Sequence, residues 1–194
     1  MEHLSSAALE AGLGDIRLAP TDNGRVELIV RRPAVDQREI LQEGTLDMQV
    51  GLVGDSWLAR GSTRTPDGLP PVETQLTIMN ARVAALVAGD ADRRCLAGDQ
   101  LYFDLDISLS NIPPGTRLEV GTAVIEVTGI PHTGCRKFAA RFGQDAVRFV
   151  NSTLGRELRL RGANGRVVAP GVIHTGDVIR KVPGSAGMVA SDLA

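Results

Sequence analysis

The sequence predicts a mainly β fold, a closed or nearly closed antiparallel or mixed barrel into which a few short helices are inserted. Twenty-two Gly and 10 Pro are spread along the 194 residues, as expected for many short strands joined by turns. Short runs of alternating or β-branched apolar residues recur along the chain, whereas helical periodicity is confined to brief segments. A chain of this length can bury a core of its own, and we interpret residues 1–194 as one domain.

The chain is expected to open with a short helix followed by a strand. Residues 5–12 combine an N-terminal serine cap with a glycine stop, which is typical of a helix. In residues 25–32 the side chains of Val26, Leu28 and Val30 alternate with polar ones. This alternation predicts a strand that presents the three apolar residues on one face.

Two loops are predicted after a second strand and its exit turn, which we expect over residues 38–47. Residues 51–62 form a compact loop that lacks the Gly-Lys-Ser/Thr element of a phosphate-binding loop. In it, Asp55 is expected to bond its own backbone, and Arg60 is either a solvated charge or part of an anion site. Residues 62–73 are rich in Pro and predict an exposed loop at the border of a functional cleft.

A short strand and a capped helix are predicted next. Residues 75–79 are apolar and β-branched, and Asn80 is a suitable N-cap for a helix over residues 81–89. Arg82 lies in the first turn, where its charge opposes the helix dipole. A cation in this place often has an anionic partner, which makes Arg82 a candidate for ligand binding.

Residues 101–109 carry the clearest strand alternation in the chain. Asp104 and Asp106 on its polar side are either paired acid/base carboxylates or a wetted sheet face, and strict alternation favours the latter. The remaining predicted elements are strands at 117–121, 123–130, 158–162, 166–169 and 177–182, a helix at 145–155, and a frayed tail from Pro183.

The stretch PHTGCRKFAARFG, residues 131–143, carries the most chemical information. Pro131 ends a strand, and a helix is predicted to begin after Cys135. Unpaired backbone N–H groups meet at such a place, and Arg136, Lys137 and Arg141 add positive charge. These conditions favour a thiolate, whereas free cysteines are otherwise mostly small buried apolar residues.

Composition excludes several classes of protein. A net charge of −2 and 3% aromatic residues offer neither a basic patch nor a stacking platform for nucleic acid. The sequence has no apolar run long enough to cross a membrane and no signal peptide at its start, so a cytoplasmic location is expected. Cys95 and Cys135 form neither a disulfide framework nor a zinc motif, and Cys95 is interpreted as a packing residue.

Several short motifs occur in an order that resembles one family. Along the chain these are GLVGD, NARV, AGDQLYFDLD, NIPPG, RLEVGTAVIEVTGIPHTGCRKF and GVIHTGD. Together they resemble the MOSC domain, the C-terminal domain of molybdenum cofactor sulfurases, and most of all its small stand-alone bacterial members. The resemblance covers about residues 25–182 and implies a β-barrel whose cleft carries one essential cysteine, here Cys135.

The same resemblance implies a molybdenum–molybdopterin cofactor with Cys135 as metal ligand, or a sulfur carrier that holds a persulfide on that cysteine. Some stand-alone relatives reduce N-hydroxylated compounds, so an oxidoreductase and a sulfurtransferase are both open. The implied partners are a sulfur donor and a redox or desulfurase protein, and no lysine site for pyridoxal phosphate is recognisable. The predicted cofactor-binding residues are Asp55, Arg60, Asn80, Arg82, Asn111, His132, Thr133, Arg136 and Lys137.

Two other functions compete with this interpretation. A cysteine hydrolase would use His132 as its base, but His132 lies only three residues before Cys135 and no orienting Asn or Asp motif is evident. A non-catalytic interaction domain would leave Cys135 with a structural role alone.

Overall fold

Seven strands close into a barrel in the computed structural model, which describes residues 3–63 and 65–185. The strand order is β11-β7-β8-β9-β5-β6-β1, and β1 pairs back onto β11. The pairing of β5 with β6 is parallel, and the other pairings around the barrel are antiparallel. This confirms the predicted barrel. Most of the tail that was expected to fray from Pro183 lies outside the described residues. The barrel strands are β1 Gly24–Arg31, β5 Leu76–Asn80, β6 Leu101–Asp104, β7 Arg117–Val120, β8 Ala123–Val127, β9 Ala163–Ala169 and β11 Val178–Lys181.

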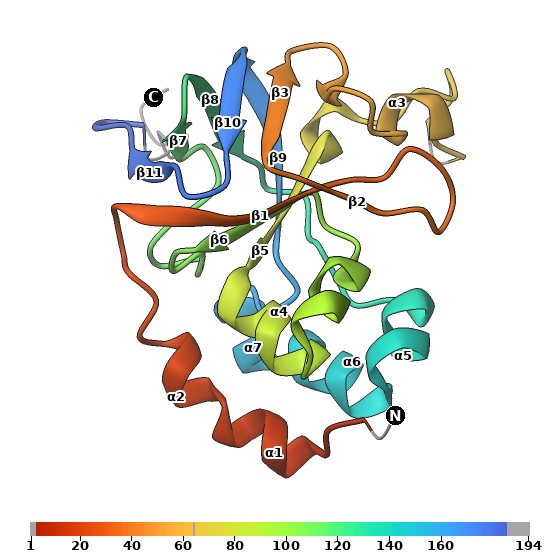
Figure 1. Cartoon of the computed structure of the whole chain (residues 1–194), viewed down its shortest axis with the longest axis vertical. Helices are drawn as coiled ribbons and strands as arrows, with labels where there is room; N and C mark the ends of the chain where they lie inside the picture. The colour runs from red at the N-terminus through yellow and green to blue at the C-terminus, as the bar shows by residue number, and fades with distance from the viewer. Residues whose placement is uncertain (1–2, 64, 186–194) are drawn as a thin grey trace, which may run out of the picture.

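A smaller three-stranded sheet stands beside the barrel (Figure 1), in the order β10-β3-β4. The segment predicted as one strand over residues 38–47 is divided between the two sheets, because β2 pairs with β1 whereas β3 pairs with β10. These strands are β2 Glu39–Leu41, β3 Glu43–Asp47, β4 Gly51–Leu52 and β10 Gly171–His174.

Most helices gather at one end of the barrel, whereas α3 lies near the small sheet (Figure 1). The longest α-helices of the described residues, α4 and α6, have eight residues each, whereas crossing a bilayer takes about 20, so none of them could span one. The helices are α1 Ser6–Ala11, α2 Leu13–Ile16, α3 Trp57–Arg60, α4 Ala81–Ala88, α5 Arg136–Phe142, α6 Gln144–Asn151 and α7 Thr153–Glu157, with 3₁₀ turns η1 Val72–Thr74 and η2 Ala91–Ala97.

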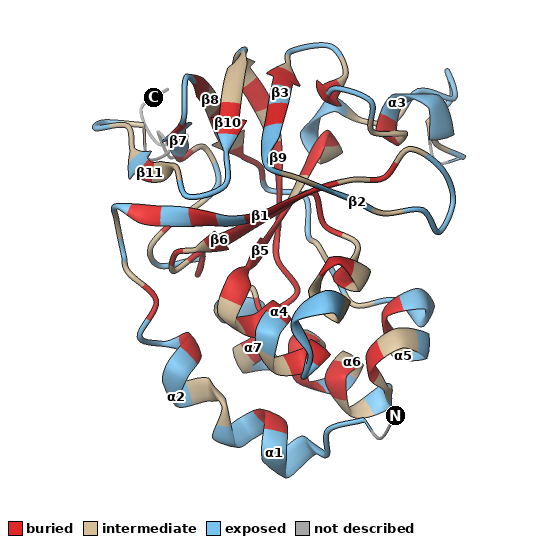
Figure 2. Cartoon of the chain, in the orientation of Figure 1, coloured by how far each residue is buried: buried red, intermediate tan, exposed pale blue. Residues whose placement is uncertain are grey.

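Two apolar cores hold these layers together. One fills the barrel and includes Ile29 and Phe103, both fully buried. The other lies between the barrel and the helices and includes Tyr102, Phe138 and Phe142. Figure 2 shows the result, with buried residues on the barrel strands and on the inward sides of the lower helices. The helices, including α5 directly after Cys135, are therefore packed against a rigid barrel.

The alternation predicted for residues 25–32 is interrupted within β1. Val26 packs inside the barrel, whereas Leu28 and Val30 pack against the helices. The pairing with β6 shifts between Val26 and Leu28, which marks a β-bulge. The prediction that the three side chains share one face is wrong, because the extra residue of the bulge turns the following side chains to the opposite face.

The predicted strand at residues 158–162 is also wrong. Leu158 follows α7, and Arg159 adopts φ 48°, in the left-handed region that a strand cannot use. The chain turns there and enters β9 only at Ala163. The apolar-basic alternation of this segment arises from a turn that buries Leu160.

Two further elements are shorter than predicted. The strand expected over residues 101–109 ends at Asp104, because Asp106 accepts a backbone hydrogen bond from two residues further on and bends the chain. The helix expected over residues 145–155 breaks at Ser152, whose side chain caps α7.

Candidate functional site

Residues 128–135 connect β8 to α5 and are called the crossing segment below. Cys135 lies at its end, where α5 begins, as the sequence predicts. It is the N-cap residue of that helix, and its side chain is exposed. The side chain of Asn151 fixes the preceding residue, because it accepts from Gly134 N at 2.8 Å and donates to Gly134 O at 3.0 Å. Asn164 donates to Ile130 O at 3.0 Å and holds the start of the segment. The thiol is therefore presented on a segment that is tied down at both ends.

The thiol lies at a cleft of about 200 Å³ that is rich in cations. Among the described residues, Asp36 is the single carboxylate on its walls. The cationic side chains on the walls are Arg32, Arg38, Arg60, Lys137, Arg141 and Arg161.

Arg32 is held in the cleft by a buried carboxylate behind it. Its Nε donates to Asp55 Oδ2 at 2.8 Å, and its Nη2 donates to Asp55 Oδ1 at 2.9 Å. The Asp55 side chain has no exposed area, and it also accepts from the backbone N–H groups of Arg32 and Trp57. A paired fork of this kind fixes the plane of the guanidinium.

A second buried carboxylate, Asp99, organises the inner wall. It accepts from Arg161 Nη1 at 2.6 Å and from His132 Nε2 at 2.8 Å. Burial alone would raise the pKa of Asp99, but the charges of Arg161 and His132 and their hydrogen bonds hold it below its usual range. Burial and the charge of Arg161 lower the pKa of His132, so its imidazole is neutral at neutral pH. The ionised Asp99 can only accept, so the His132 proton resides on Nε2 and leaves Nδ1 as an acceptor.

The cleft carries more positive charge than its own residues neutralise. Burial, reinforced by repulsion from Arg141 and Arg32, lowers the pKa of Arg38. Burial and the charge of Arg32 likewise lower the pKa of Arg60. The Nε atoms of Arg38 and Arg161 are buried and have no hydrogen-bond partner among the described residues. Such a site favours an anion that would accept from these donors.

Residues 99–180 match the family model of the MOSC domain. Over these residues the chain is similar to the MOSC domain. The matched region includes Asp99, His132, Cys135 and Arg161, so it spans the inner wall of the cleft and the thiol. No curated protein matches the sequence.

Solved structures share the barrel at low sequence identity. The YuaD protein from Bacillus subtilis aligns with a TM-score of 0.56 at 17% identity, over 81% of this chain and 94% of that one. YiiM from Escherichia coli aligns with a TM-score of 0.53 at 19% identity, over 81% of this chain and 69% of that one. YiiM from Geobacillus stearothermophilus gives a TM-score of 0.50 at 13% identity, over 86% of this chain and 77% of that one. At these identities the likeness concerns the fold.

The MOSC barrel brings only part of the predicted site together. Arg60 and Lys137 line the cleft beside Cys135. Asp55 lies behind the cleft wall and positions Arg32. His132 and Thr133 line an adjacent cavity, which shares Arg161 with the cleft.

Three predicted cofactor-binding residues lie away from the cleft and support the fold. Asn80 caps α4 as predicted, by accepting from the backbone of its first turn. The anionic partner of Arg82 is Asp104, whose Oδ1 lies 2.7 Å from Arg82 Nε. This bond raises the pKa of Arg82, and burial, which lowers it, has the smaller effect. Asn111 accepts from Lys181 Nζ at 3.0 Å and donates to two backbone carbonyls.

Arg136 and the loop 62–73 were also expected at the cleft, but the structure does not place Arg136 or the described part of the loop on its walls. Arg136 begins α5 and is exposed, but it does not line the cleft. The described residues of the loop 62–73 do not line it either; the contribution of this region comes from Ser56 and Arg60 just before it.

Sequence reasoning missed several residues that form the cleft. Arg32 ends the first predicted strand in an Arg-Arg pair, and Asp99 is part of a motif that resembles the family, so both carried a usable signal. Arg38 and Arg161 carried none, because distant parts of the chain bring them together. Arg141 was expected to add positive charge near Cys135, and it lines the cleft. The described residues contain no group of three or more His, Cys, Asp or Glu side chains that could hold a metal ion by itself.

Proposed function

We propose that this MOSC protein binds an anionic molybdenum–pterin cofactor in the cation-rich cleft, with the Cys135 thiolate as the protein ligand of the metal. The observation that carries the proposal is the exposed thiol at a cleft lined by six cationic side chains and one carboxylate. The phosphate of a pterin cofactor needs such donors, and a soft thiolate suits molybdenum.

The donor set of the cleft fits this group. Arg38, Arg60 and Lys137 line the cleft without an ion pair within the described part of the chain, so their charges are available to phosphate oxygens. The described residues contain no cluster that would hold a bare metal ion, which favours a metal that arrives on an organic ligand and takes one thiolate from the protein. When bound, the group would supply two-electron redox chemistry, as in the reduction of N-hydroxylated compounds.

The residues of the chain would bind and orient the cofactor. Arg38, Arg60 and Lys137 would hold the phosphate, and Asp55 would keep Arg32 in a fixed plane on the same wall. Asp99 would hold Arg161 in the same way. His132 would keep an unprotonated Nδ1 available as a proton acceptor in the adjacent cavity.

A sulfur-carrier function is the second candidate, and the exposure of Cys135 favours it. A thiol on an open rim can be reached by a desulfurase partner, whereas a thiol enclosed by a cofactor cannot. In this case the cysteine would carry one extra sulfur atom as a persulfide.

The two candidates are separated by what the purified protein carries. We expect wild type from a host that makes the cofactor to retain molybdenum, by elemental analysis, and pterin, by fluorescence of its oxidation product. Cys135→Ser should lose the metal, and Arg38→Gln should lose both. The matched controls are Cys95→Ser, a buried thiol away from the cleft, and Arg180→Gln, an exposed arginine on β11; both should behave as wild type.

A persulfide on Cys135 without metal or pterin, seen as the mass of one added sulfur, would favour the sulfur carrier instead. Wild type that takes up neither group after incubation with molybdopterin and with a sulfur donor would contradict both functions.

A further inference from the structure

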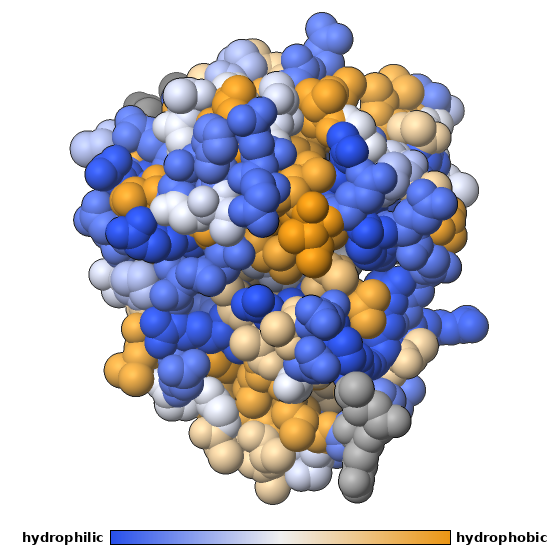
Figure 3. Space-filling view, in the orientation of Figure 1, coloured by the Kyte–Doolittle hydropathy of each residue, from blue (hydrophilic) through white to orange (hydrophobic). Residues whose placement is uncertain are grey.

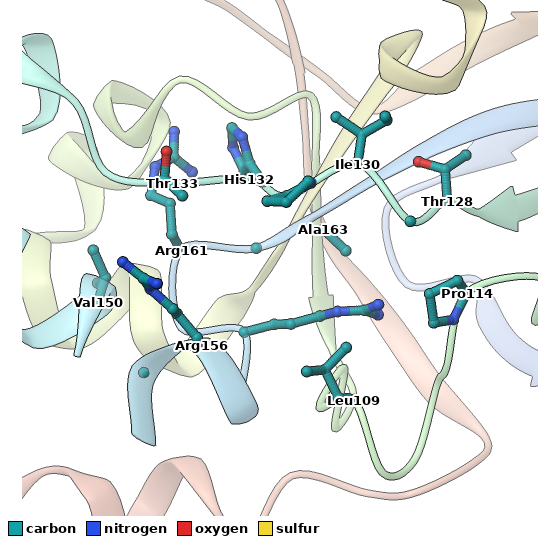
Figure 4. Close-up of a pocket in the computed structure, with 15 residues that line it drawn as sticks. Leu109, Pro114, Thr128, Ile130, His132, Thr133, Val150, Arg156, Arg161 and Ala163 are labelled. Carbon is teal, nitrogen blue, oxygen red and sulfur yellow. The ribbon is translucent and has the colours of Figure 1, made fainter. Parts of the chain in front are cut away.

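A second cavity, of about 340 Å³, adjoins the cleft at Cys135, and Arg161 lines both. Figure 4 shows this cavity, with Thr128 and Ile130 on the segment along one wall and Leu109, Pro114 and Arg156 across from them. Its volume suits a small organic molecule. The apolar side chains on its walls are Leu109, Pro114, Ile130, Pro131, Val150 and Ala163.

Three arginines enter this apolar cavity, and no carboxylate of the described residues lines it. Asp99 neutralises one of them, Arg161. Arg156 and Arg159 have no ion pair within the described part of the chain; each donates one bond to a backbone carbonyl, from Arg156 Nε at 3.1 Å and from Arg159 Nη1 at 2.7 Å. A guanidinium has five N–H donors, so both retain donors for a ligand.

The guanidinium of Arg159 is partly removed from water. Burial lowers the pKa of its guanidinium, and no carboxylate offsets that burial. Its backbone lies in the left-handed region at φ 48°, which is unfavourable for residues other than glycine because their Cβ crowds the backbone. Such conformations persist where the surroundings hold them, and they cluster at binding sites. Here the turn directs a desolvated cation to an apolar wall.

We propose that the second cavity binds a monocarboxylic acid with a flat apolar body, whose carboxylate pairs with Arg156 and Arg159. The planar fork of a guanidinium matches a carboxylate in two parallel hydrogen bonds. The apolar walls accommodate the body, and they provide little to solvate the second charge of a phosphate group. This inference goes beyond the proposed function, which uses Arg161 and His132 but neither Arg156 nor Arg159. Arg161 lines both sites, whereas Arg156 and Arg159 line only this cavity, and Cys135 and Lys137 line only the cleft.

The proposal is tested with 2-naphthoate in isothermal titration calorimetry. Wild type should bind 2-naphthoate saturably. The amide 2-naphthamide has the same body without the charge, and its affinity should be lower by a factor of about ten or more. Arg159→Asn removes the charge while keeping a residue type that tolerates the left-handed backbone. It should weaken 2-naphthoate binding about tenfold, and so should Arg156→Gln, which changes an exposed position.

Two control variants and a fold check make the result decisive. Cys135→Ser and Lys137→Gln change the other cleft and should bind 2-naphthoate as wild type does. This also keeps the test separate from the proposed function, since cofactor loading can fail while carboxylate binding remains. Circular dichroism and thermal unfolding verify that each variant is folded, and Arg156→Gln provides an answer if Arg159→Asn does not fold.

Three results would overturn the proposal. The first is an absence of saturable binding to wild type, and the second is equal affinity for the acid and the amide. The third is inorganic phosphate binding as tightly as 2-naphthoate with loss in the same variants, which would assign the cavity to a different anion.

Discussion

Asp55 and Asp99 have the same role at two sides of one cleft. Each is fully buried, and each carries an arginine on the cleft wall in a close ion pair. Removing one partner of a buried pair is costly, because it leaves an uncompensated charge. The two carboxylates therefore fix Arg32 and Arg161 rigidly and are not available to neutralise the other cations of the cleft.

His132 should make the stability of the protein depend on pH. Because burial and Arg161 depress its pKa in the folded state, the unfolded chain takes up the proton first as pH falls through about 6.5. The contribution of the neutral imidazole to stability is full above that pH and is lost below it, until the folded imidazole also titrates. The loss is at most about 1.4 kcal/mol per pH unit.

We expect urea unfolding to show this contribution of His132 to the free energy of unfolding. Wild type is compared with His132→Gln at about pH 7.5 and about pH 5.5. His3 and His174 are present in both proteins, so their titration cancels in the comparison. The stability advantage of wild type should shrink on acidification. An advantage that grows instead would mean that Asp99 raises the pKa of His132 by more than burial and Arg161 lower it.

Among the elements, the crossing segment between β8 and α5 has the most influence on the site. Its position depends on amide side chains, because Asn164 binds Ile130 O and Asn151 binds both backbone groups of Gly134. Asn151 ends α6, so the segment is tied to a helix that packs in the second core.

Removing this tie should loosen the segment and destabilise the fold. Asn151→Ala deletes both hydrogen bonds to Gly134, and we expect it to lower the free energy of unfolding by about 1–3 kcal/mol. Asn151→Asp keeps the acceptor for Gly134 N, but it replaces the donor with an oxygen that faces Gly134 O, and it places a negative charge at the end of α6. We therefore expect it to destabilise the protein too, while still protecting Gly134 N from exchange. Urea unfolding gives both values, and hydrogen exchange at Gly134 should be faster in Asn151→Ala alone. Equal exchange in the two variants would show that the segment is held by other contacts.

The elements that the sequence predicts well are those whose signals are local. The cap of Asn80, the strand before it and the helix start after Cys135 depend on neighbouring residues, and all three are confirmed. The bulge in β1 and the turn at Arg159 depend on pairing with distant segments, which no local pattern records. The site follows the same rule: Cys135 stands out in its own motif, whereas the arginines around it converge only in the folded barrel.

At the scale of the whole molecule, the barrel closes through a short seam. β1 and β11 pair only at Gly24 with Ile179 and at Arg25 with Val178. Figure 3 shows hydrophilic side chains over much of one face, with an apolar patch near its centre. The fit of the backbone at Gly24 therefore matters for closure.

Gly24→Ala should weaken this closure. A Cβ at Gly24 would lie 2.4 Å from Asp104 O and 2.9 Å from the Leu105 side chain, so the strands of the barrel would have to move apart. Overpacking of this kind costs about 1–3 kcal/mol, and here it acts at the first residue of β1 beside the seam. We expect thermal unfolding to show a lower Tm and hydrogen exchange to be faster at Ile179.

Gly14→Ala is the matched control, because a Cβ there meets nothing within 4 Å and the residue lies within helix α2. It should be neutral or stabilise the protein by up to about 1 kcal/mol, since alanine costs less entropy than glycine in a helix. If Gly24→Ala matches this control in both Tm and exchange, β1 accommodates the added Cβ without opening the barrel, and the backbone fit at Gly24 does not limit its closure.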